Sequence, residues 1–382
     1  NNGGEAGTFT LCINNTKNTY YSLNSGDWDN PANWSKVSHT GPPASTYPGV
    51  GDIVYIQGHE ITVMNNDTAA AVYMTVADNS TKLLLEDSRL EIDGKMEIIN
   101  NGENYEGEVA LNDTSVLNIY DNLEMIRNGG NQPFSMDISH GSEAIIGKHF
   151  DIQNDGGSTH PSELLLRNTA SLKIKENFRL SHTSGPRIYV SLNDTSLVDA
   201  NGNIALSNSS PNTVEIEAKD TSSVRLARNF SRGTPKYGIV SFNAKSTLVL
   251  DGESYHQSLA SSNGDDGDSI RYQNIIVNNT KITSPQVSLG GPVFVNGSLY
   301  LKDGIMGTSL ANLLTLDNTA TLKGGSETSF VDGPMKKIGN TAFTFPVGDG
   351  DNYQPISISA PSDPADAFTA EYIHQDPDDS YS

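Results

Sequence analysis

Residues 163–185 read ELLLRNTASLKIKENFRLSHTSG, and this stretch decides the fold. Apolar and polar residues alternate in three short runs, LLL, SLKIK and NFRLS. A period of two is typical of β-strands, and runs this short predict short strands. Turns rich in Asn, Thr, Gly and Ser separate the runs, and no run has the apolar spacing of an amphipathic helix. The stretch therefore predicts a unit of three short strands.

The same unit recurs with a period of about 26 residues from about residue 80 to 260, which is typical of a solenoid. Its first anchor is an apolar residue just before a turn: Leu85, Leu111, Ile138, Leu166, Leu192, Ala218 and Phe242. Its second anchor follows the next turn: Met96, Leu123, Phe150, Phe178, Ile204, Phe230 and Tyr255. We therefore expect an all-β fold, a right-handed parallel β-helix in which rungs stack about 4.8 Å apart and each anchor series forms an internal column.

Composition excludes several classes of protein. The chain has 382 residues, and its 24 basic and 46 acidic side chains give a net charge of −22. Such a field repels nucleic acid, and no basic stripe interrupts it. No apolar run approaches the length of about 20 residues that crosses a bilayer, so no membrane span is expected. The single cysteine, Cys12, excludes an internal disulfide framework and a multi-cysteine zinc site.

The ends of the repeat predict four regions. We expect residues 1–19 to be the tail of a preceding β module or a linker, and residues 20–64 to form an N-terminal cap with the first rung. The cap contains both tryptophans, Trp28 and Trp34, whose large rings suit the sealing of an open apolar rung. Residues 65–325 are the predicted β-helix, with wider rungs from about residue 270. Residues 326–382 are the predicted C-terminal β region, leading to a following module.

Three stretches carry a resemblance to a known group of proteins: GDWDNPANWS (26–35), GDIVYIQGHEITV (51–63) and GNTAFTFPVGD (339–349). They resemble the β-helical regions of large, adhesin-like cell-surface proteins of Bacteroidota that are exported by type IX secretion. Residues 7–13 are similar to the last strand of a jelly-roll module that commonly precedes such helices. The resemblance implies an extracellular or outer-surface location and neighbouring modules in the same long chain.

Candidate sites are few. Residues 261–268, SSNGDDGD, place Asp265, Asp266 and Asp268 where carboxylates suit calcium, although a charged surface turn is the favoured explanation of this stretch. A turn column that contains Asp87, Asp113, Asp194 and Asp220 brings like charges close together on adjacent rungs. This column could bind a cation, or its carboxylates could simply be solvated at the corners. Asp-Thr-Ala and Asp-Thr-Ser triplets resemble O-glycan acceptors of Bacteroidota at Thr68 and Thr114. The eight histidines are dispersed, and no catalytic constellation is recognised.

The expected function is that of a non-catalytic, extracellular structural or adhesive segment, a stiff acidic rod whose loops contact glycans or a cell-surface receptor. The alternative is a carbohydrate-binding or polysaccharide-cleaving module, and a weaker one is a filament subunit. A row of outward aromatic residues would favour carbohydrate binding. Tyr105, Tyr120, Tyr189 and Tyr237 do not share a repeat position, which argues against such a row.

Overall fold

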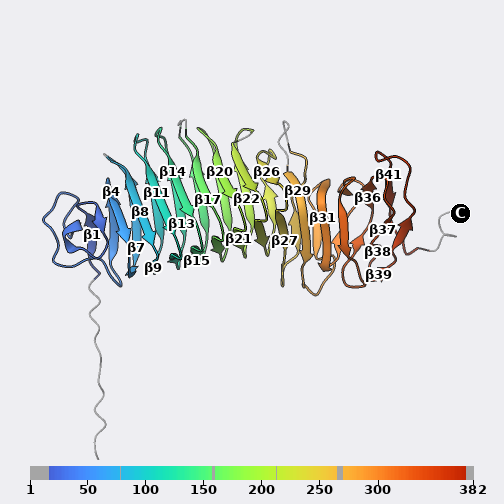
Figure 1. Cartoon of the computed structure of the whole chain (residues 1–382), viewed down its shortest axis with the longest axis horizontal. Coiled ribbons are helices and arrows are strands. Elements are labelled where there is room, and N and C mark those ends of the chain that lie inside the picture. Colours follow the sequence, from blue (N-terminus) through green and yellow to red (C-terminus); the bar gives the residue numbers. More distant parts are fainter. Residues whose placement is uncertain (1–16, 78, 157–159, 212, 265–269, 376–382) are drawn as a thin grey trace, which may run out of the picture.

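The computed structural model describes residues 17–77, 79–156, 160–211, 213–264 and 270–375. These residues form an all-β parallel solenoid of about ten turns, which confirms the predicted fold class. Figure 1 shows a rod in which the chain advances steadily from one end to the other, so that each turn contacts only the turns before and after it. In the described residues the helical structure is a short 3₁₀ turn, Pro31–Asn33, and no helix is long and apolar enough to cross a membrane.

Three sheets run along the rod, and each receives one strand per turn. Sheet A contains β1 (Thr19–Ser22), β3 (Trp34–Ser35), β4 (Ile53–Gln57), β7 (Ala71–Val76), β10 (Met96–Asn100), β13 (Leu123–Arg127), β16 (Phe150–Asn154), β19 (Phe178–His182), β22 (Ile204–Asn208) and β25 (Phe230–Arg232). Sheet B contains β2 (Gly26–Asp27), β5 (Glu60–Val63), β8 (Thr81–Glu86), β11 (Gly107–Asn112), β14 (Phe134–Ile138), β17 (Ser162–Leu166), β20 (Ile188–Leu192), β23 (Val214–Ala218) and β26 (Ile239–Phe242). Sheet C contains β6 (Asn66–Ala69), β9 (Arg89–Ile92), β12 (Val116–Ile119), β15 (Glu143–Ile146), β18 (Ser171–Ile174), β21 (Leu197–Ala200), β24 (Ser223–Leu226) and β27 (Thr247–Leu250).

Towards the C-terminal end the turns change shape. The long strands β29 (Ile270–Asn278) and β31 (Val293–Asp303) continue sheets B and C as single strands. They are followed by β33 (Leu314–Leu316), β34 (Thr321–Gly324), β36 (Met335–Ile338) and the antiparallel β41 (Ala367–Ala370). A fourth sheet, sheet D, contains β28 (Gln257–Leu259), β30 (Val287–Leu289), β32 (Met306–Gly307), β35 (Val331–Asp332), β38 (Val347–Asp349) and β39 (Asn352–Tyr353). A hairpin of β37 (Phe343–Phe345) and β40 (Ile356–Ile358) lies beside this end.

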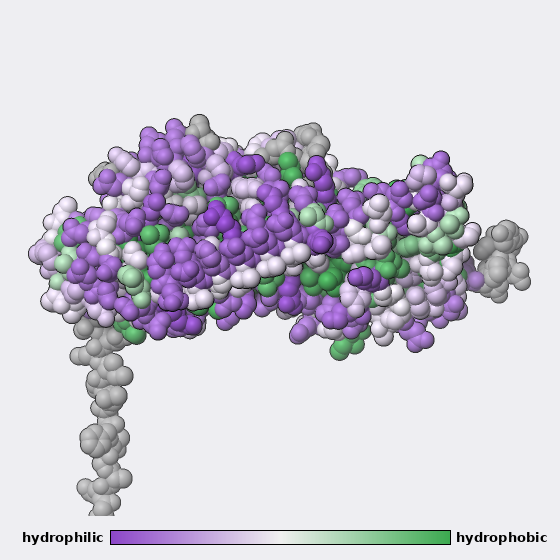
Figure 2. Space-filling view, in the orientation of Figure 1, coloured by the Kyte–Doolittle hydropathy of each residue, from purple (hydrophilic) through white to green (hydrophobic). Residues whose placement is uncertain are grey.

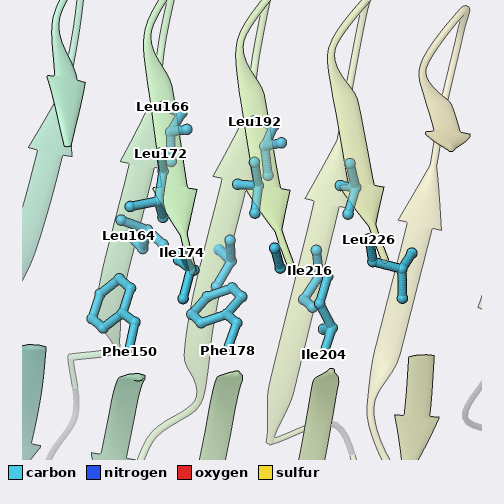
Figure 3. Close-up of a cluster of buried hydrophobic side chains, with 14 of the residues drawn as sticks. Phe150, Leu164, Leu166, Leu172, Ile174, Phe178, Leu192, Ile204, Ile216 and Leu226 are labelled. Carbon is cyan, nitrogen blue, oxygen red and sulfur yellow. The ribbon is translucent and has the colours of Figure 1, made fainter. Parts of the chain in front are cut away.

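The register of the strands stacks equivalent residues. Leu85, Leu111, Ile138, Leu166 and Leu192 are successive register partners, and all five are fully buried. Figure 3 shows Leu166 and Leu192 of this column facing the column of Phe150, Phe178 and Ile204 across the interior. The rings of Phe150 and Phe178 stack at 5.3 Å. Burial of one side chain therefore depends on the turn above and below, which makes the interior a continuous spine.

The last member of the second predicted column is wrong. Tyr255 is 48% exposed, and the buried Leu259 takes its position. The backbone N–H of Ser258 donates to Asn229 Oδ1 (2.8 Å), just as the backbone N–H of Asn229 donates to Asn203 Oδ1 (3.1 Å) one turn earlier, so Leu259 lies over Phe230. The reason is a long loop: three residues join sheet C to sheet A in the preceding turns, whereas residues 251–258 lie between Leu250 and Leu259.

The prediction of wider terminal rungs is also wrong, because the turns become shorter. Register partners are 27 residues apart from Leu248 to Ile275, 24 from Ile275 to Leu299 and 23 from Leu299 to Leu322. The corner between sheets B and C is lost where β29 and β31 run straight through it, and a straight strand needs fewer residues than two strands and a turn.

The N-terminal end is covered by aromatic side chains. Trp28 and Trp34 are buried, and their rings meet edge to face at 5.1 Å. Their indole N–H groups donate to the carbonyl oxygens of Pro48 (3.2 Å) and Trp28 (2.6 Å), so the polar atoms of both rings are satisfied. The antiparallel pairing of β3 with β1 closes the edge of sheet A. An edge covered in this way resists pairing with a second chain.

Candidate functional site

In seven successive turns, the corner between sheets B and C places one residue in the left-handed backbone region, with φ between 44° and 59°. These residues are Asp87, Asp113, His140, Asn168, Asp194, Asp220 and Ala244. Asn and Asp adopt this conformation more readily than other residues with a side chain, which explains their frequency here. This is the turn column of like charges that the sequence predicted, with Asp87, Asp113, Asp194 and Asp220 among its members.

The side chains of this column hydrogen-bond the backbone of the turn before. Asp220 Oδ2 accepts from the N–H of Asp194 (3.1 Å), and Asp194 Oδ2 accepts from the N–H of Asn168 (2.9 Å). Asp87 accepts from the Thr114 hydroxyl. In the described part of the chain no group of three or more acidic, histidine or cysteine side chains could hold a metal ion. Asp265, Asp266 and Asp268 lie outside the described residues.

The two threonines that resemble glycan acceptors occupy different positions. Thr114 is exposed at the corner and donates its hydroxyl hydrogen to Asp87. Thr68 is half-buried on the outer face of β6, beside Glu91 of β9. The geometry thus presents Thr114 to solvent more openly than Thr68.

A row of outward tyrosines was missed by the sequence reasoning. Tyr21, Tyr55 and Tyr73 are register partners on sheet A, and their rings stack at 5.3 Å and 5.0 Å within about 16° of parallel. His39 meets the Tyr21 ring edge to face, and Lys95 Nζ lies 5.3 Å from the Tyr73 ring centre. Because the stacked faces contact one another, they are closed to a sugar ring. This row stiffens the sheet and does not form a carbohydrate track.

The long loop of residues 251–256 builds a different feature, and Gln257 at the start of β28 holds its base. Gln257 is fully buried and makes four hydrogen bonds: its Nε2 donates to the carbonyl oxygens of Leu226 (2.7 Å) and Arg228 (3.0 Å), and its Oε1 accepts from Gly252 N (3.0 Å) and Asn279 Nδ2 (2.8 Å). The loop therefore has a fixed position on the rod.

His256 ties the same loop to the following turn. Its Nδ1 lies 2.9 Å from the carbonyl oxygen of Pro285, and its Nε2 lies 2.8 Å from Ser288 Oγ. A carbonyl oxygen only accepts, so Nδ1 donates to Pro285, while Nε2 shares a hydrogen bond with the serine hydroxyl. The neighbouring Tyr255 is thereby held away from the core and exposed.

Tyr255 forms one wall of a groove on the outer surface, which we call the Tyr255 groove. It has a volume of about 340 Å³ and is lined by Asp199, Asn201, Arg225, Ala227, Asp251, Glu253, Ser254 and Tyr255. Ala227 contributes only a methyl group to this lining. The Arg228 guanidinium lies 3.8 Å from the Tyr255 ring centre, so it supports one face of the ring. An exposed aromatic ring is thus fixed at the edge of a polar hollow.

The charged groups of the Tyr255 groove are unequally engaged. Arg225 donates two N–H groups to Asp251 Oδ2, one of them at 3.0 Å. Asp199 makes no hydrogen bond or ion pair with any described residue through its carboxylate, and burial raises its pKa, against the lowering effect of Arg225. The Asn201 side-chain amide is likewise unengaged by the described residues. A carboxylate and an amide are therefore available to a ligand.

A second hollow extends the Tyr255 groove toward the N-terminal end. It has a volume of about 260 Å³, and Asn201 lines both hollows. Lys175, Asn201, Ala227 and Asp251 take equivalent places in successive turns, because each backbone N–H donates to the strand end of the turn before. Three steps between turns correspond to about 14 Å along the rod. The two hollows together form an elongated depression.

Another hollow, of about 400 Å³, lies near the C-terminal end and contains Lys337. The ammonium of this buried lysine donates to the carbonyl oxygens of Asp317 (2.6 Å), Asn318 (2.9 Å) and Ile338 (2.7 Å), while burial lowers its pKa. These three bonds use all of its donors, so Lys337 holds a loop in place and has none left for a ligand.

The chain matches no family model, no curated protein and no solved structure.

Proposed function

We propose that this chain is a non-catalytic, extracellular structural and adhesive segment of a large bacterial surface protein. The observation that carries the proposal is the set of parallel ladders that run along the rod: sheet A extends from the covered N-terminal end to β25, and sheets B and C continue through β29, β31, β33 and β36 to the antiparallel strand β41. Continuous ladders resist bending, so such a rod holds its surface loops at a fixed distance from their attachment. The resemblance to type IX-secreted adhesins of Bacteroidota supports an outer-surface location.

The surface of the rod suits contact with hydrated partners. Figure 2 shows hydrophilic residues over most of the visible face, with apolar colour gathered mainly toward the C-terminal half. Several outward charges are paired between neighbouring turns, as in Lys82 with Glu108 (3.0 Å) and Arg167 with Asp137 (3.0 Å). A net charge of −22 repels nucleic acid and other acidic polymers. Neutral glycans and cell-surface receptors are partners that suit such a surface.

The alternative is a polysaccharide-cleaving module, and one observation favours it. Asp199 and Asp251 line the same groove, and paired carboxylates are the usual machinery of glycoside hydrolysis. Against it, Asp251 is engaged by Arg225 through two N–H groups. This pairing leaves Asp251 poorly placed to act as a free base or nucleophile.

The experiment measures adhesion and cleavage together. The chain is immobilised on beads and presented to a panel of polysaccharides and to cell surfaces, and the same polysaccharides are assayed for new reducing ends and unsaturated products. Retention without cleavage is the expected result. Cleavage of any bound polysaccharide would overturn the non-catalytic role, and failure of every glycan and cell surface to be retained would overturn the adhesive one.

A further inference from the structure

We infer that the Tyr255 groove is a saccharide-binding site that takes neutral, hydroxyl-rich sugar units of an extended glycan. The inference rests on the proposed function, because it names the site through which the rod would contact glycan. It is carried by three features that meet on one outer surface: a fixed exposed aromatic ring, unengaged polar groups beside it, and a depression longer than one turn.

The aromatic ring is prepared for stacking on one side only. Arg228 covers one face of Tyr255, and the tyrosine lines the groove while remaining 48% exposed. A pyranose ring has an apolar C–H face that packs against such an aromatic surface. The stacked rings of Tyr21, Tyr55 and Tyr73 provide the contrast, since their faces contact one another.

The polar groups match a polyol. The Asp199 carboxylate accepts hydrogen bonds, and the Asn201 amide both donates and accepts, which suits neighbouring hydroxyl groups that do the same. Arg225 and Asp251 already neutralise each other, so their pair forms a fixed polar wall. Because the Arg225–Asp251 pair and the Tyr255 ring are held in place before a ligand arrives, little ordering entropy is lost at these groups on binding.

Charge selects against anionic sugars. Asp199, Asp251 and Glu253 face a single arginine, Arg225, among the charged residues that line the Tyr255 groove. A uronic acid or a sulfated sugar would add a negative charge to a surplus of negative charge. The adjoining hollow adds Lys175, Glu176 and Arg228, a net charge of +1, so the whole depression carries a net charge of −1. A neutral hexose or pentose polymer fits the whole depression.

The test uses the full chain on an array of neutral, acidic and amino-sugar oligosaccharides, followed by titration calorimetry with the best neutral oligosaccharide. Tyr255→Ala removes the stacking face, and we expect at least a tenfold loss of affinity. Ala227→Trp fills the floor of the groove from outside the core, and we expect no measurable binding. Tyr105→Ala is the matched control, because Tyr105 is 40% exposed and lies outside the groove.

The outcomes separate the site from the function. Neutral-glycan binding that Tyr255→Ala weakens at least tenfold, Ala227→Trp abolishes and Tyr105→Ala leaves unchanged supports the inference. Unchanged binding by Tyr255→Ala and Ala227→Trp, with circular dichroism showing folded variants, would place the glycan elsewhere while leaving the adhesive role intact. Binding confined to amino sugars or acidic sugars would overturn the neutral specificity. If wild-type chain binds no glycan at all, both the site and the glycan-contact role are wrong.

Discussion

Asp67 provides a pH-dependent test of the interior. Its side chain points inward from β6 opposite Leu90, is 8% exposed, and its Oδ2 has no hydrogen-bond partner among the described residues. Burial, and to a smaller extent the charge of Asp29, raises the pKa of Asp67 to about 6 from its ordinary value of 3.8. The ionised form is therefore less stable in the folded state than in the unfolded state.

The sign of the effect follows from proton binding. Between about pH 4 and pH 6 the folded chain binds more protons at this site than the unfolded chain, so this aspartate makes the protein less stable as the pH rises through that window. A shift of this size corresponds to about 2 to 3 kcal/mol at pH 8. With about 0.8 kcal/mol/K of unfolding entropy for a chain of this length, that energy changes Tm by about 3 °C.

We therefore expect the Tm difference between Asp67→Asn and wild type to increase by about 3 °C in favour of the variant from pH 4 to pH 8. Differential scanning calorimetry of both proteins across this range measures the difference, in which the titration of other groups cancels. Asn66→Ser, a change at an exposed position of the same strand that alters no titratable group, should give a difference that does not vary with pH. A flat Asp67→Asn difference, or one that decreases toward pH 8, would refute the reasoning.

Three further changes test the interior, the loop and the cap. Arg127 is buried and donates to the carbonyl oxygens of Gly129, Gly130, Gln132 and Pro161. Arg127→Met leaves these oxygens without their donor and should lower the free energy of unfolding by about 3 kcal/mol. An unchanged midpoint of denaturant unfolding would contradict this. Gln257→Leu leaves the buried hydrogen-bond partners of Gln257 unsatisfied, so we expect the free energy of unfolding to fall by about 1 to 3 kcal/mol. We also expect faster hydrogen exchange in residues 251–257. Unaltered exchange there would show that other contacts hold the loop. Trp34→Ala removes part of the cover over the first turn, so we expect a lower Tm and, because the uncovered end can pair with a second chain, larger particles by light scattering. A stable monomer would mean that the tryptophan is not needed as a cover.

The sequence predicted the interior well because the interior repeats. A side chain that must lie over its equivalent in the next turn is restricted in size and polarity, so Leu111, Ile138 and Leu166 recur at near-constant spacing. The outward residues carry no such restriction. Tyr21, Tyr55 and Tyr73 share a column although they are separated by 34 and 18 residues, because the cap and the first turns differ in length.

The Tyr255 groove escaped prediction for a related reason. Its walls come from three turns, and its key residue lies on a loop that departs from the period. The sequence contained one sign of this departure, the shortened spacing of 24 residues from Ala218 to Phe242. It did not show that the next connection, residues 251–256 between β27 and β28, is longer than the equivalent three-residue connections of the earlier turns. Where a solenoid varies its turn length, a search for surface sites should begin there.

The left-handed corner gives the chain a natural unit of length. Each corner from Asp87 to Ala244 has the same backbone conformation and bonds only to the corners of the neighbouring turns. If residues 193–218 were removed, Leu192 would be joined to Lys219, which has the same position in its turn as Asn193 has in the turn before. Duplicating or excising one winding would leave the adjoining windings matched. A gene encoding such a rod can therefore extend or shorten its reach in increments of about 4.8 Å without redesigning either end.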